Sequence, residues 1–506
     1  MDSIPIYRRL ASHYREAIDS GALAPGDRMP SLRELMQRHG VSLSTALQVC
    51  RQLEADGWLE ARPRSGYFVR QPDRGEHPAL EEPQPGPPPD PAQYVGMNAH
   101  VSGIIARGRQ AAVRVNFSAA RGAPGLYPGA ALKNAALRAL RQHPDLLVKP
   151  AARGGNEAFR AALARRALAE GMVLAPDDVL VTQGCIEALN LALRAVAAPG
   201  DIVAVESPSF YGLLQVLETL GLRALEIPTS PHTGISLEAM QLAFDTYPDI
   251  KALVVVPHLQ NPLGAIMPEE HKARLVDLCR EHAAALIEDD TYTALVDDGQ
   301  PRRALKSWDR DGGVIHCVSL HKVLAPGMRL GWMNAGRWHA RVEMLKYAQS
   351  RDNDELPQMA AAEVIASGDY DRHLQRLRGK LRELRQRTAA AIASYFPSGT
   401  RFSQPRGGLA LWVELPEQIS SQAVFDRALD AGILVAPGMM FSNSNRYDHF
   451  VRLNCGMPYT PEVDQALREL GTILHDLQRG TAGGARTPAR RSGSDRLAAA
   501  LNLPTE

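Results

Sequence analysis

The chain has 506 residues, of which 45% are hydrophobic and 22% charged, and its formal net charge at pH 7 is +1. This length predicts two or three domains, and the near-neutral charge excludes a protein that binds nucleic acid through a globally basic surface. The five cysteines are scattered, which argues against a disulfide framework, and no Cys/His cluster suggests a metal site. The sequence has no apolar signal segment and no apolar run long enough for a membrane span. Together these features predict a cytoplasmic protein.

The first seventy residues predict three helices followed by a hairpin. Apolar spacing favours helices over residues 6–20, 32–39 and 42–56, and a Ser three residues before a Glu forms a capping box at the second of them. Residues 58–62 and 67–70 are typical of two short strands. This order is that of a winged helix-turn-helix, which lays its second motif helix in the major groove. A small helical protein-interaction domain is the alternative.

Two motifs in this region, PGDRMPSLREL over Pro25–Leu35 and GVSLSTA over Gly40–Ala46, resemble the GntR family of bacterial regulators. The resemblance implies a double-stranded DNA operator as partner, and DNA contacts from Arg28, Ser31, Ser42, Ser44, Thr45 and the wing residue Gly66. Arg33 and Arg64 join this set because the segment is rich in arginine, which supplies phosphate contacts. Leu43 and Leu47 stand where the family usually has Arg.

Proline-rich and low-complexity stretches separate this module from the rest of the chain. Residues 71–94 contain so many prolines that helix and central strand are excluded, and an extended spacer is expected. The end of the chain is rich in Gly, Ala, Arg and Ser, which favours disorder. The predicted divisions are 1–70 for the winged helix-turn-helix, 71–110 for the Pro-rich linker, 111–478 for the large domain and 479–506 for a disordered tail.

The large domain alternates amphipathic helices with short apolar strands. This pattern predicts an α/β domain with a mainly parallel sheet covered on both faces. Five such strands are 179–182, 202–205, 252–256, 285–288 and 313–319. Ligands of such sheets bind beyond the carboxyl ends of the strands, so the residues that follow each strand are the candidates for a site.

Lys322 lies where the strand over 313–319 ends. Burial lowers the pKa of a lysine, and a neutral amine can condense with an aldehyde to form a Schiff base. Ser319, three residues before it, and Arg329, seven residues after it, can hold a phosphate. An amine beside a phosphate clamp is what pyridoxal phosphate (PLP) requires. An ordinary surface lysine is the alternative.

Other strand ends carry matching chemistry, each with a plainer alternative. Gly184 begins a helix whose free N–H groups can bind phosphate, as in many strand-to-helix turns. Phe210 can stack on a pyridine ring or belong to the core, and Asn261 can donate to a phenolate oxygen or simply make a turn. Asp289 can keep a pyridine nitrogen protonated, and Tyr292 can reach the ring hydroxyl. The pair of acidic residues Asp289 and Asp290 is also typical of a helix cap or a metal site.

In this order, these strand ends resemble the fold-type I aminotransferases of the aspartate aminotransferase superfamily over roughly residues 115–475, including a small C-terminal α+β subdomain. The resemblance implies that Lys322 is the Schiff-base lysine. It implies a PLP site formed by Asp289 at the pyridine nitrogen, Asn261 and Tyr292 at the ring oxygen, Phe210 stacked on the ring, and Gly184, Cys185, Ile186, Ser319 and Arg329 around the phosphate.

The same resemblance implies that Arg452 binds a substrate carboxylate. Two positions depart from the family pattern. His321 replaces the small residue that usually precedes the lysine, and residues 148–155 lack the Tyr that relatives extend into the neighbouring subunit's site.

A GntR-type winged helix joined by a linker to an aminotransferase-like domain resembles the MocR subfamily. The resemblance implies a PLP-dependent transcription regulator that senses PLP or a small carboxylate-bearing amine effector, through a change in conformational equilibrium. It also implies a homodimer, for which a head-to-tail arrangement is one option. A working aminotransferase, and a DNA-binding dimer with a cofactor-free scaffold domain, are the two alternatives.

Overall fold

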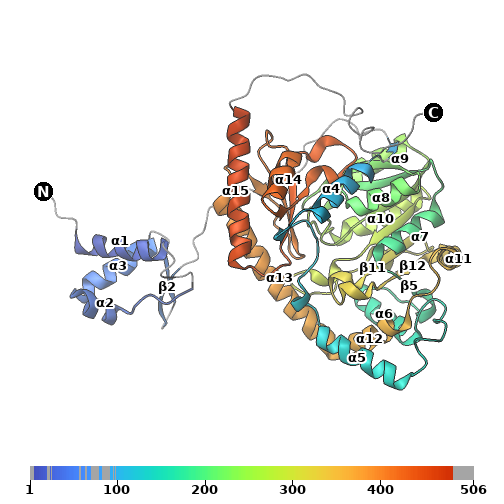
Figure 1. Cartoon of the computed structure of the whole chain (residues 1–506), viewed down its shortest axis with the longest axis horizontal. Helices are drawn as coiled ribbons and strands as arrows, with labels where there is room; N and C mark the ends of the chain where they lie inside the picture. Colours follow the sequence, from blue (N-terminus) through green and yellow to red (C-terminus); the bar gives the residue numbers. More distant parts are fainter. Residues whose placement is uncertain are drawn as a thin grey trace. The chain divides into compact units, whose positions relative to one another are not determined.

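The chain divides into two compact units, Met1–His77 and Pro78–Glu506 (Figure 1). The computed structural model describes residues 5–19, 23, 26–55, 58–62, 65–69, 79–81, 92–94, 96 and 98–482. The predicted DNA contact Arg64, most of the predicted linker before residue 92 and the predicted tail beyond residue 482 lie outside the described residues. Within the described part, no helix has both the length and the apolar character that crossing a membrane requires.

The N-terminal unit has the predicted three helices and hairpin. Its elements are α1 (Ile6–Asp19), α2 (Leu32–His39), α3 (Leu43–Ala55), β1 (Leu59–Arg62) and β2 (Gly66–Val69), and the two strands pair antiparallel. Helix α2 begins with the predicted capping box, because Ser31 Oγ accepts from Glu34 N and the Glu34 carboxylate accepts from Ser31 N. Gly40, at φ 60°, ends it in the left-handed conformation.

A small apolar core holds this unit together. Buried side chains from all three helices and both strands form one cluster: Ala11, Tyr14, Ile18, Met29, Leu35, Ala46, Val49, Cys50, Leu53, Leu59 and Val69. Helix α3 therefore turns its apolar face inward and leaves the residues at its N-terminus exposed, including Leu43 at 55%. An exposed N-terminus of the second motif helix is what major-groove binding requires.

The second unit is built on a nine-stranded sheet. Its order is β3-β7-β6-β9-β10-β11-β12-β5, with β8 paired to β7. The strands are β3 (Gln93–Tyr94), β5 (Leu180–Thr182), β6 (Ile202–Ser207), β7 (Arg223–Ser230), β8 (Gly234–Ile235), β9 (Ile250–Val255), β10 (Ala285–Asp289), β11 (Val314–Ser319) and β12 (Gly331–Asn334). The neighbours from β7 to β11 pair parallel, and β3 and β12 pair antiparallel, which confirms the predicted mainly parallel sheet.

Helices cover both faces of this sheet (Figure 1). The helices between β3 and the C-terminal part are α4 (Asn98–Gln110), α5 (Gly129–Gln142), α6 (Glu157–Ala167), α7 (Cys185–Val196), α8 (Tyr211–Thr219), α9 (Leu237–Thr246), α10 (Glu269–Glu281), α11 (His339–Gln349), α12 (Glu355–Ala366) and α13 (Gly368–Tyr395). In β6, Val203 and Val205 join the core that includes α7 and α8, whereas Ile202 and Ala204 join the core that includes α9 and α10. This alternation explains the continuous apolar run of the strand, since both faces are buried.

The C-terminal part forms the predicted small α+β subdomain. Its four-stranded antiparallel sheet has the order β13 (Arg401–Phe402), β14 (Ala410–Glu414), β17 (Phe450–Asn454) and β16 (Ala436–Pro437). Helices α14 (Ser421–Asp430) and α15 (Pro461–Ala482) accompany it, and β15 (Ile433–Leu434) pairs parallel with β4 (Val115–Asn116). The pairing of β4 brings the segment after residue 116 to this subdomain.

Two predicted boundaries need correction. The linker was predicted over 71–110, but β3 pairs with β7, and α4 buries Val101 and Ile104 in the main core of the large unit. The tail was predicted from residue 479, but α15 continues to Ala482. In both places a helical segment lies next to a Pro- or Gly-rich stretch. The prediction grouped the helical residues with the linker or the tail.

Candidate cofactor site

The ends of β5, β6, β9, β10 and β11 meet around one cavity of about 270 Å³. Every predicted site residue of the large domain except Gly184 lines this cavity: Cys185, Ile186, Phe210, Asn261, Asp289, Tyr292, Ser319, Lys322, Arg329 and Arg452. Gly184 lies just behind it, since a Cβ at this position would be 3.5 Å from Arg329 Nη2. The predicted convergence of residues that are far apart in the sequence is therefore present in the fold.

Lys322 follows β11 in a short 3-10 turn and points into the cavity. Its Nζ donates a hydrogen bond to the Ala120 carbonyl and lies 5.9 Å from the ring centroid of Tyr292. Burial, and then the Arg452 guanidinium, lower the pKa of Lys322 to about 7. The amine is therefore substantially neutral near pH 7, which makes it a nucleophile toward an aldehyde.

We expect the rate of PLP uptake to rise steeply as the pH rises through about 7. A lysine with a lowered pKa becomes nucleophilic once the pH exceeds that pKa, whereas an ordinary lysine would need a pH near 10. Stopped-flow absorbance of cofactor-free protein mixed with PLP, from pH 5.5 to 9, measures this rate. A rate that keeps increasing up to pH 9 without levelling would contradict a lowered pKa.

Asp289 is a buried carboxylate at the end of β10. Its Oδ1 accepts from the Thr291 hydroxyl at 2.6 Å and from the Cys185 thiol at 3.0 Å. Burial raises its pKa, and no described residue forms an ion pair with it. A carboxylate that is held in place by neutral donors and lacks a cation fits the protonated nitrogen of a pyridine ring.

Arg452 lies in β17 and is 1% exposed. Its guanidinium donates to Asn261 Oδ1 at 3.0 Å and to the Ser118 carbonyl at 2.6 Å, and it packs 4.9 Å from the Phe441 ring centroid. Its Nε has no partner among the described residues, and no carboxylate there neutralises it. A buried guanidinium fixed by two neutral acceptors is a site for an anion that comes from outside.

Asn261 also donates, at 3.5 Å, to the Tyr292 hydroxyl, whose pKa burial raises. Tyr292 therefore keeps its proton and can donate it to a ring oxygen. Phe210 is the residue just before α8, and its half-buried side chain lines the cavity. An aromatic face and two polar groups thus surround the position between Asp289 and Lys322.

The N-terminus of α7 provides the phosphate-binding features. Gly184, at φ 87°, precedes the helix, and the first two helical residues, Cys185 and Ile186, line the cavity. Their N–H groups have no acceptor within the helix and are free to bind an anion. Arg329 reaches the same place and donates to the Gln183 carbonyl at 3.0 Å. Helix N–H groups beside a guanidinium and the Ser319 hydroxyl match the oxygen-rich, dianionic phosphate of PLP.

Seven residues that line the cavity were not among the predicted site residues: Ala119, Ala120, Arg121, Tyr211, Val256, Thr291 and His321. Thr291 holds Asp289, and the pattern Asp289-Asp290-Thr291 offered a signal that a hydroxyl two residues on could bond the carboxylate. Ala120 and Arg121 come from the irregular segment after β4. That segment has no periodicity or motif, so no signal in the sequence could have found them.

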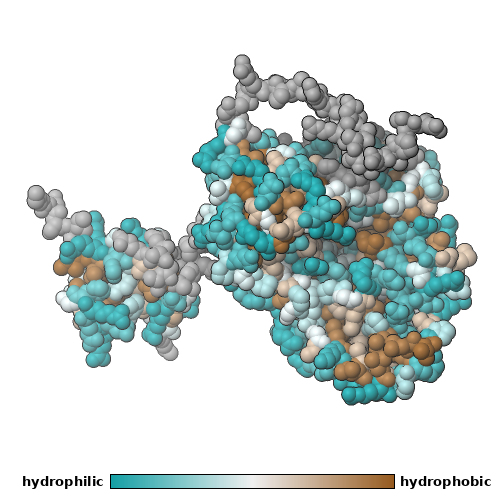
Figure 2. Space-filling model, viewed as in Figure 1, coloured by the Kyte–Doolittle hydropathy of each residue, from teal (hydrophilic) through white to brown (hydrophobic). Residues whose placement is uncertain are grey.

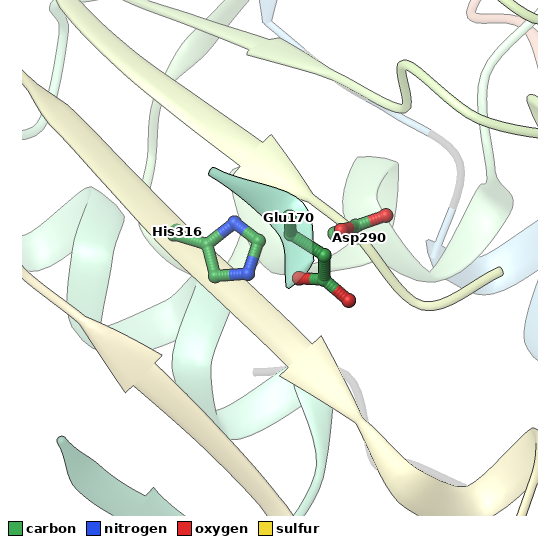
Figure 3. A group of neighbouring side chains, drawn as sticks. All are labelled: Glu170, Asp290 and His316. Atoms are coloured by element: carbon green, nitrogen blue, oxygen red, sulfur yellow. The ribbon is translucent and has the colours of Figure 1, made fainter. Parts of the chain in front are cut away.

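Behind the site, the structure brings together Glu170, Asp290 and His316, whose ligand-type atoms lie within 4.8 Å of one another (Figure 3). His316 and Asp290 are buried. His316 Nδ1 bonds Glu288 at 2.9 Å, and burial is outweighed by the charge of Glu288, so that the pKa of His316 rises to about 9. Asp290 faces His258, at 3.1 Å.

Cations already lie in this network, so it needs no added ion. His258 Nε2 accepts from Lys272 Nζ at 2.7 Å, Lys272 also pairs with Glu269, and His316 pairs with Glu288. Burial, and then the charge of Asp290, raise the pKa of Glu170 to about 8, so Glu170 is largely protonated near pH 7 and adds little charge. We therefore interpret the group as a structural network that fixes the end of β10, and with it Asp289.

Replacing His316 by Gln is expected to destabilise the large unit and to remove a pH dependence. A base whose pKa is raised on folding contributes stability that is complete below its unfolded pKa, about 6.5, and is lost as the pH rises through about 9. The stability of the wild type should therefore fall by about 3 kcal/mol between these values, as measured by thermal unfolding. Without the imidazolium, the buried Glu288 loses its cationic partner and keeps the backbone N–H groups of Leu305 and Lys306, at a cost of about 3–5 kcal/mol. Equal pH slopes in the two proteins would contradict this interpretation, and His282→Gln is the control.

The comparison with known proteins agrees with this geometry. Residues 6–69 match the model of bacterial regulatory proteins of the gntR family, and residues 124–470 match that of aminotransferase class I and II. The chain is 37% identical over 474 residues to the uncharacterized HTH-type transcriptional regulator YjiR of Escherichia coli strain K12, covering 93% of this chain and 98% of that protein. The chain belongs to the GntR family of regulators that carry an aminotransferase domain. This is the MocR-like architecture, and the predicted combination of a DNA-binding module with an aminotransferase-like domain is confirmed.

Solved structures agree with the fold of the large unit of this GntR-family regulator. LysN, an α-aminoadipate aminotransferase of Thermus thermophilus, was solved complexed with N-(5'-phosphopyridoxyl)-L-leucine. It has a TM-score of 0.68 and 27% identity, over 74% of this chain and 95% of its own. The kynurenine aminotransferase of Pyrococcus horikoshii has a TM-score of 0.69 at 24% identity, over 74% of this chain and 94% of its own, which shows the fold alone.

Proposed function

We propose that this chain is a PLP-dependent transcription regulator that works in the cytoplasm. The observation that carries the proposal is the convergence of Lys322, Asp289, Arg329 and Arg452 on one cavity, in a chain whose N-terminal unit is a GntR-type DNA-binding module. When bound, PLP supplies an electron sink for an attached amine. The protein supplies the amine, the counter-charges and the shape of the site.

In this proposal each group at the cavity has one task. Lys322 presents a neutral amine to the aldehyde of PLP, and Asp289 holds the proton on the pyridine nitrogen. Asn261 and Tyr292 bind the ring oxygen, and Phe210 covers one face of the ring. The phosphate lies against Gly184, Cys185, Ile186, Ser319 and Arg329.

Arg452 is proposed to bind the carboxylate of a small amine effector. Its guanidinium is buried, fixed by Asn261 and the Ser118 carbonyl, and faces the same cavity as Lys322. An effector that carries both an amine and a carboxylate would then bridge the cofactor and Arg452. Binding of this kind changes the relative free energies of the conformations of the large unit, and the linker passes the change to the DNA-binding units.

The DNA interface is proposed to include Arg28, Ser31, Arg33, Ser42, Ser44, Thr45 and Gly66. All of them are exposed except Thr45, which is partly exposed. The hydroxyls of Ser44 and Thr45 lie 2.9 and 3.0 Å from that of Ser42, at the N-terminus of α3, where groove contacts are made. Arg28 bridges to the wing at Phe68 and lies beside Gly66. These contacts place a cation next to the wing, where a phosphate would lie.

We expect Arg28→Ala to weaken DNA binding across all sequences and to reduce the salt slope of log K by about one, since one phosphate contact is lost. Fluorescence anisotropy with operator and unrelated DNA, at several salt concentrations, measures both quantities. Arg8→Ala, an exposed arginine on α1, is the matched control. An unchanged slope in Arg28→Ala would remove this residue from the interface.

A homodimer is part of the proposal. Leu147 and Val148 follow α5 and are 71% and 83% exposed, and Figure 2 shows a hydrophobic area where α5 lies. Leu147 immediately precedes residues 148–155, and Val148 begins them. This is where relatives carry the Tyr that extends into the neighbouring subunit's site. Exposed apolar side chains at this position favour a contact with a second copy.

A working aminotransferase is the second candidate, because the cavity retains the full set of cofactor groups. Two assays on PLP-loaded full-length protein separate the two functions. A shift of the DNA upstream of its own gene that changes with PLP or an amino acid supports the regulator. Steady turnover of an amino donor with a keto acid, together with DNA binding that does not change with PLP or an amino acid, supports the enzyme.

A further inference from the structure

A second guanidinium, that of Arg121, opens onto the cofactor cavity. Arg121 lines both this cavity and a neighbouring cavity of about 630 Å³. Its backbone is fixed, because its N–H donates to the Ala119 carbonyl at 2.8 Å and its carbonyl accepts from Asn454 Nδ2 at 3.1 Å. Its side chain, in contrast, is exposed and has no hydrogen-bond or ion-pair partner among the described residues.

The charges around the cofactor cavity leave Arg121 without a counterpart. Three guanidinium groups line it, those of Arg329, Arg452 and Arg121, beside the largely neutral amine of Lys322, whereas Asp289 is its one carboxylate among the described residues. In the proposed function, Arg329 faces the phosphate, Asp289 faces the pyridine nitrogen and Arg452 faces the effector carboxylate. One fixed cation then remains, at the junction of the two cavities.

The neighbouring cavity gives an effector room to extend past the cofactor. Its walls are largely apolar, with Leu132, Leu324, Pro124 and Met328 among them. The side chain of an effector whose amine lies near Lys322 would therefore contact apolar walls and then the Arg121 guanidinium. A guanidinium at the junction of the two cavities favours an effector with an acidic group. An acidic group can form a charge-assisted hydrogen bond with the guanidinium, and a neutral group cannot.

We infer that Arg121 is a second anion-binding residue and that the effector is a dicarboxylic amino acid, whose distal carboxylate it binds. This inference rests on the proposed function, since it takes Lys322 and Arg452 as the sites of the amine and the first carboxylate. Arg121 sets the specificity of the site and does not touch the phosphate.

The test compares acidic amino acids with their neutral amides on PLP-loaded full-length protein. Calorimetric titration with aspartate, glutamate and 2-aminoadipate, and with asparagine and glutamine, gives the affinities. We expect at least one acid to bind about 10- to 100-fold more tightly than its amide, as for a hydrogen bond to a charged group. Arg121→Gln should abolish this preference while leaving PLP affinity and amide binding unchanged, and Arg121→Lys should restore part of it.

Arg310→Gln, an exposed arginine away from both cavities, is the control and should keep the preference. Three results would overturn the inference: no acid preferred over its amide, a preference that survives Arg121→Gln, or loss of PLP affinity in Arg121→Gln, which would assign Arg121 to the phosphate. Failure of the wild type to take up PLP is a separate result, visible before any amino acid is added, and it overturns the proposed function itself.

Discussion

Lys322→Ala protein is expected to be colourless once added PLP has been removed by gel filtration, whereas the wild type keeps the visible absorbance of bound PLP. The substitution removes the amine in the cavity whose pKa is lowered to about 7. The phosphate-binding groups at Gly184 and Arg329 remain, so PLP can still bind weakly. It should then wash out during gel filtration, because no covalent link to the chain holds it.

The control for this experiment is Lys133→Ala, an exposed lysine on α5. Thermal unfolding without PLP should show Lys322→Ala to be as stable as the wild type, or more stable, because a lysine with a lowered pKa is costly to bury. Visible absorbance that survives both substitutions and gel filtration would mean that another amine carries the cofactor.

Asp289→Asn is expected to lower PLP affinity by about 150- to 5000-fold. The carboxylate is buried, and its hydrogen bonds with Thr291 and Cys185 fix its position. Asn has the same shape and no charge, so the protonated pyridine nitrogen would lie unpaired in a buried site. Removing one partner of a buried ion pair costs about 3–5 kcal/mol, which corresponds to this loss of affinity.

Fluorescence titration of cofactor-free protein with PLP measures the loss. Asp177→Asn changes a carboxylate whose side chain is 91% exposed, and it should leave PLP affinity unchanged. If Asp289→Asn bound PLP as tightly as the wild type, the carboxylate would not face the pyridine nitrogen, and the assignment of the ring position would be wrong.

The strand ends of the large domain could be predicted because the sequence carries the signal locally. Strands such as β6 are continuous apolar runs, and the polar residues that matter follow each run directly. Lys322, with Ser319 and Arg329 around it, lies in one stretch of the chain. Since parallel strands end at one edge of a sheet, the convergence followed from the α/β pattern.

What could not be predicted depends on contacts between distant segments. Ala120, which accepts from Lys322 Nζ, is separated from it by 202 residues and lies in a segment without periodicity. Glu170 ends a short 3-10 turn, Asp290 follows β10 and His316 lies in β11, and their spacing resembles no motif. Helix α4 was predicted to belong to the linker. It belongs to the large unit because Val101 and Ile104 pack in the core of that unit, and this packing leaves no signal in the composition of the segment.

The most direct measurement compares DNA binding by wild-type and Lys322→Ala protein, with and without PLP and an acidic amino acid. The DNA is the region upstream of the protein's own gene. We predict that the ligands change wild-type affinity about 5- to 150-fold, the range of typical coupling between sites, and leave Lys322→Ala unaffected. Identical responses of the two proteins would contradict a regulator that senses its ligand through the amine at position 322.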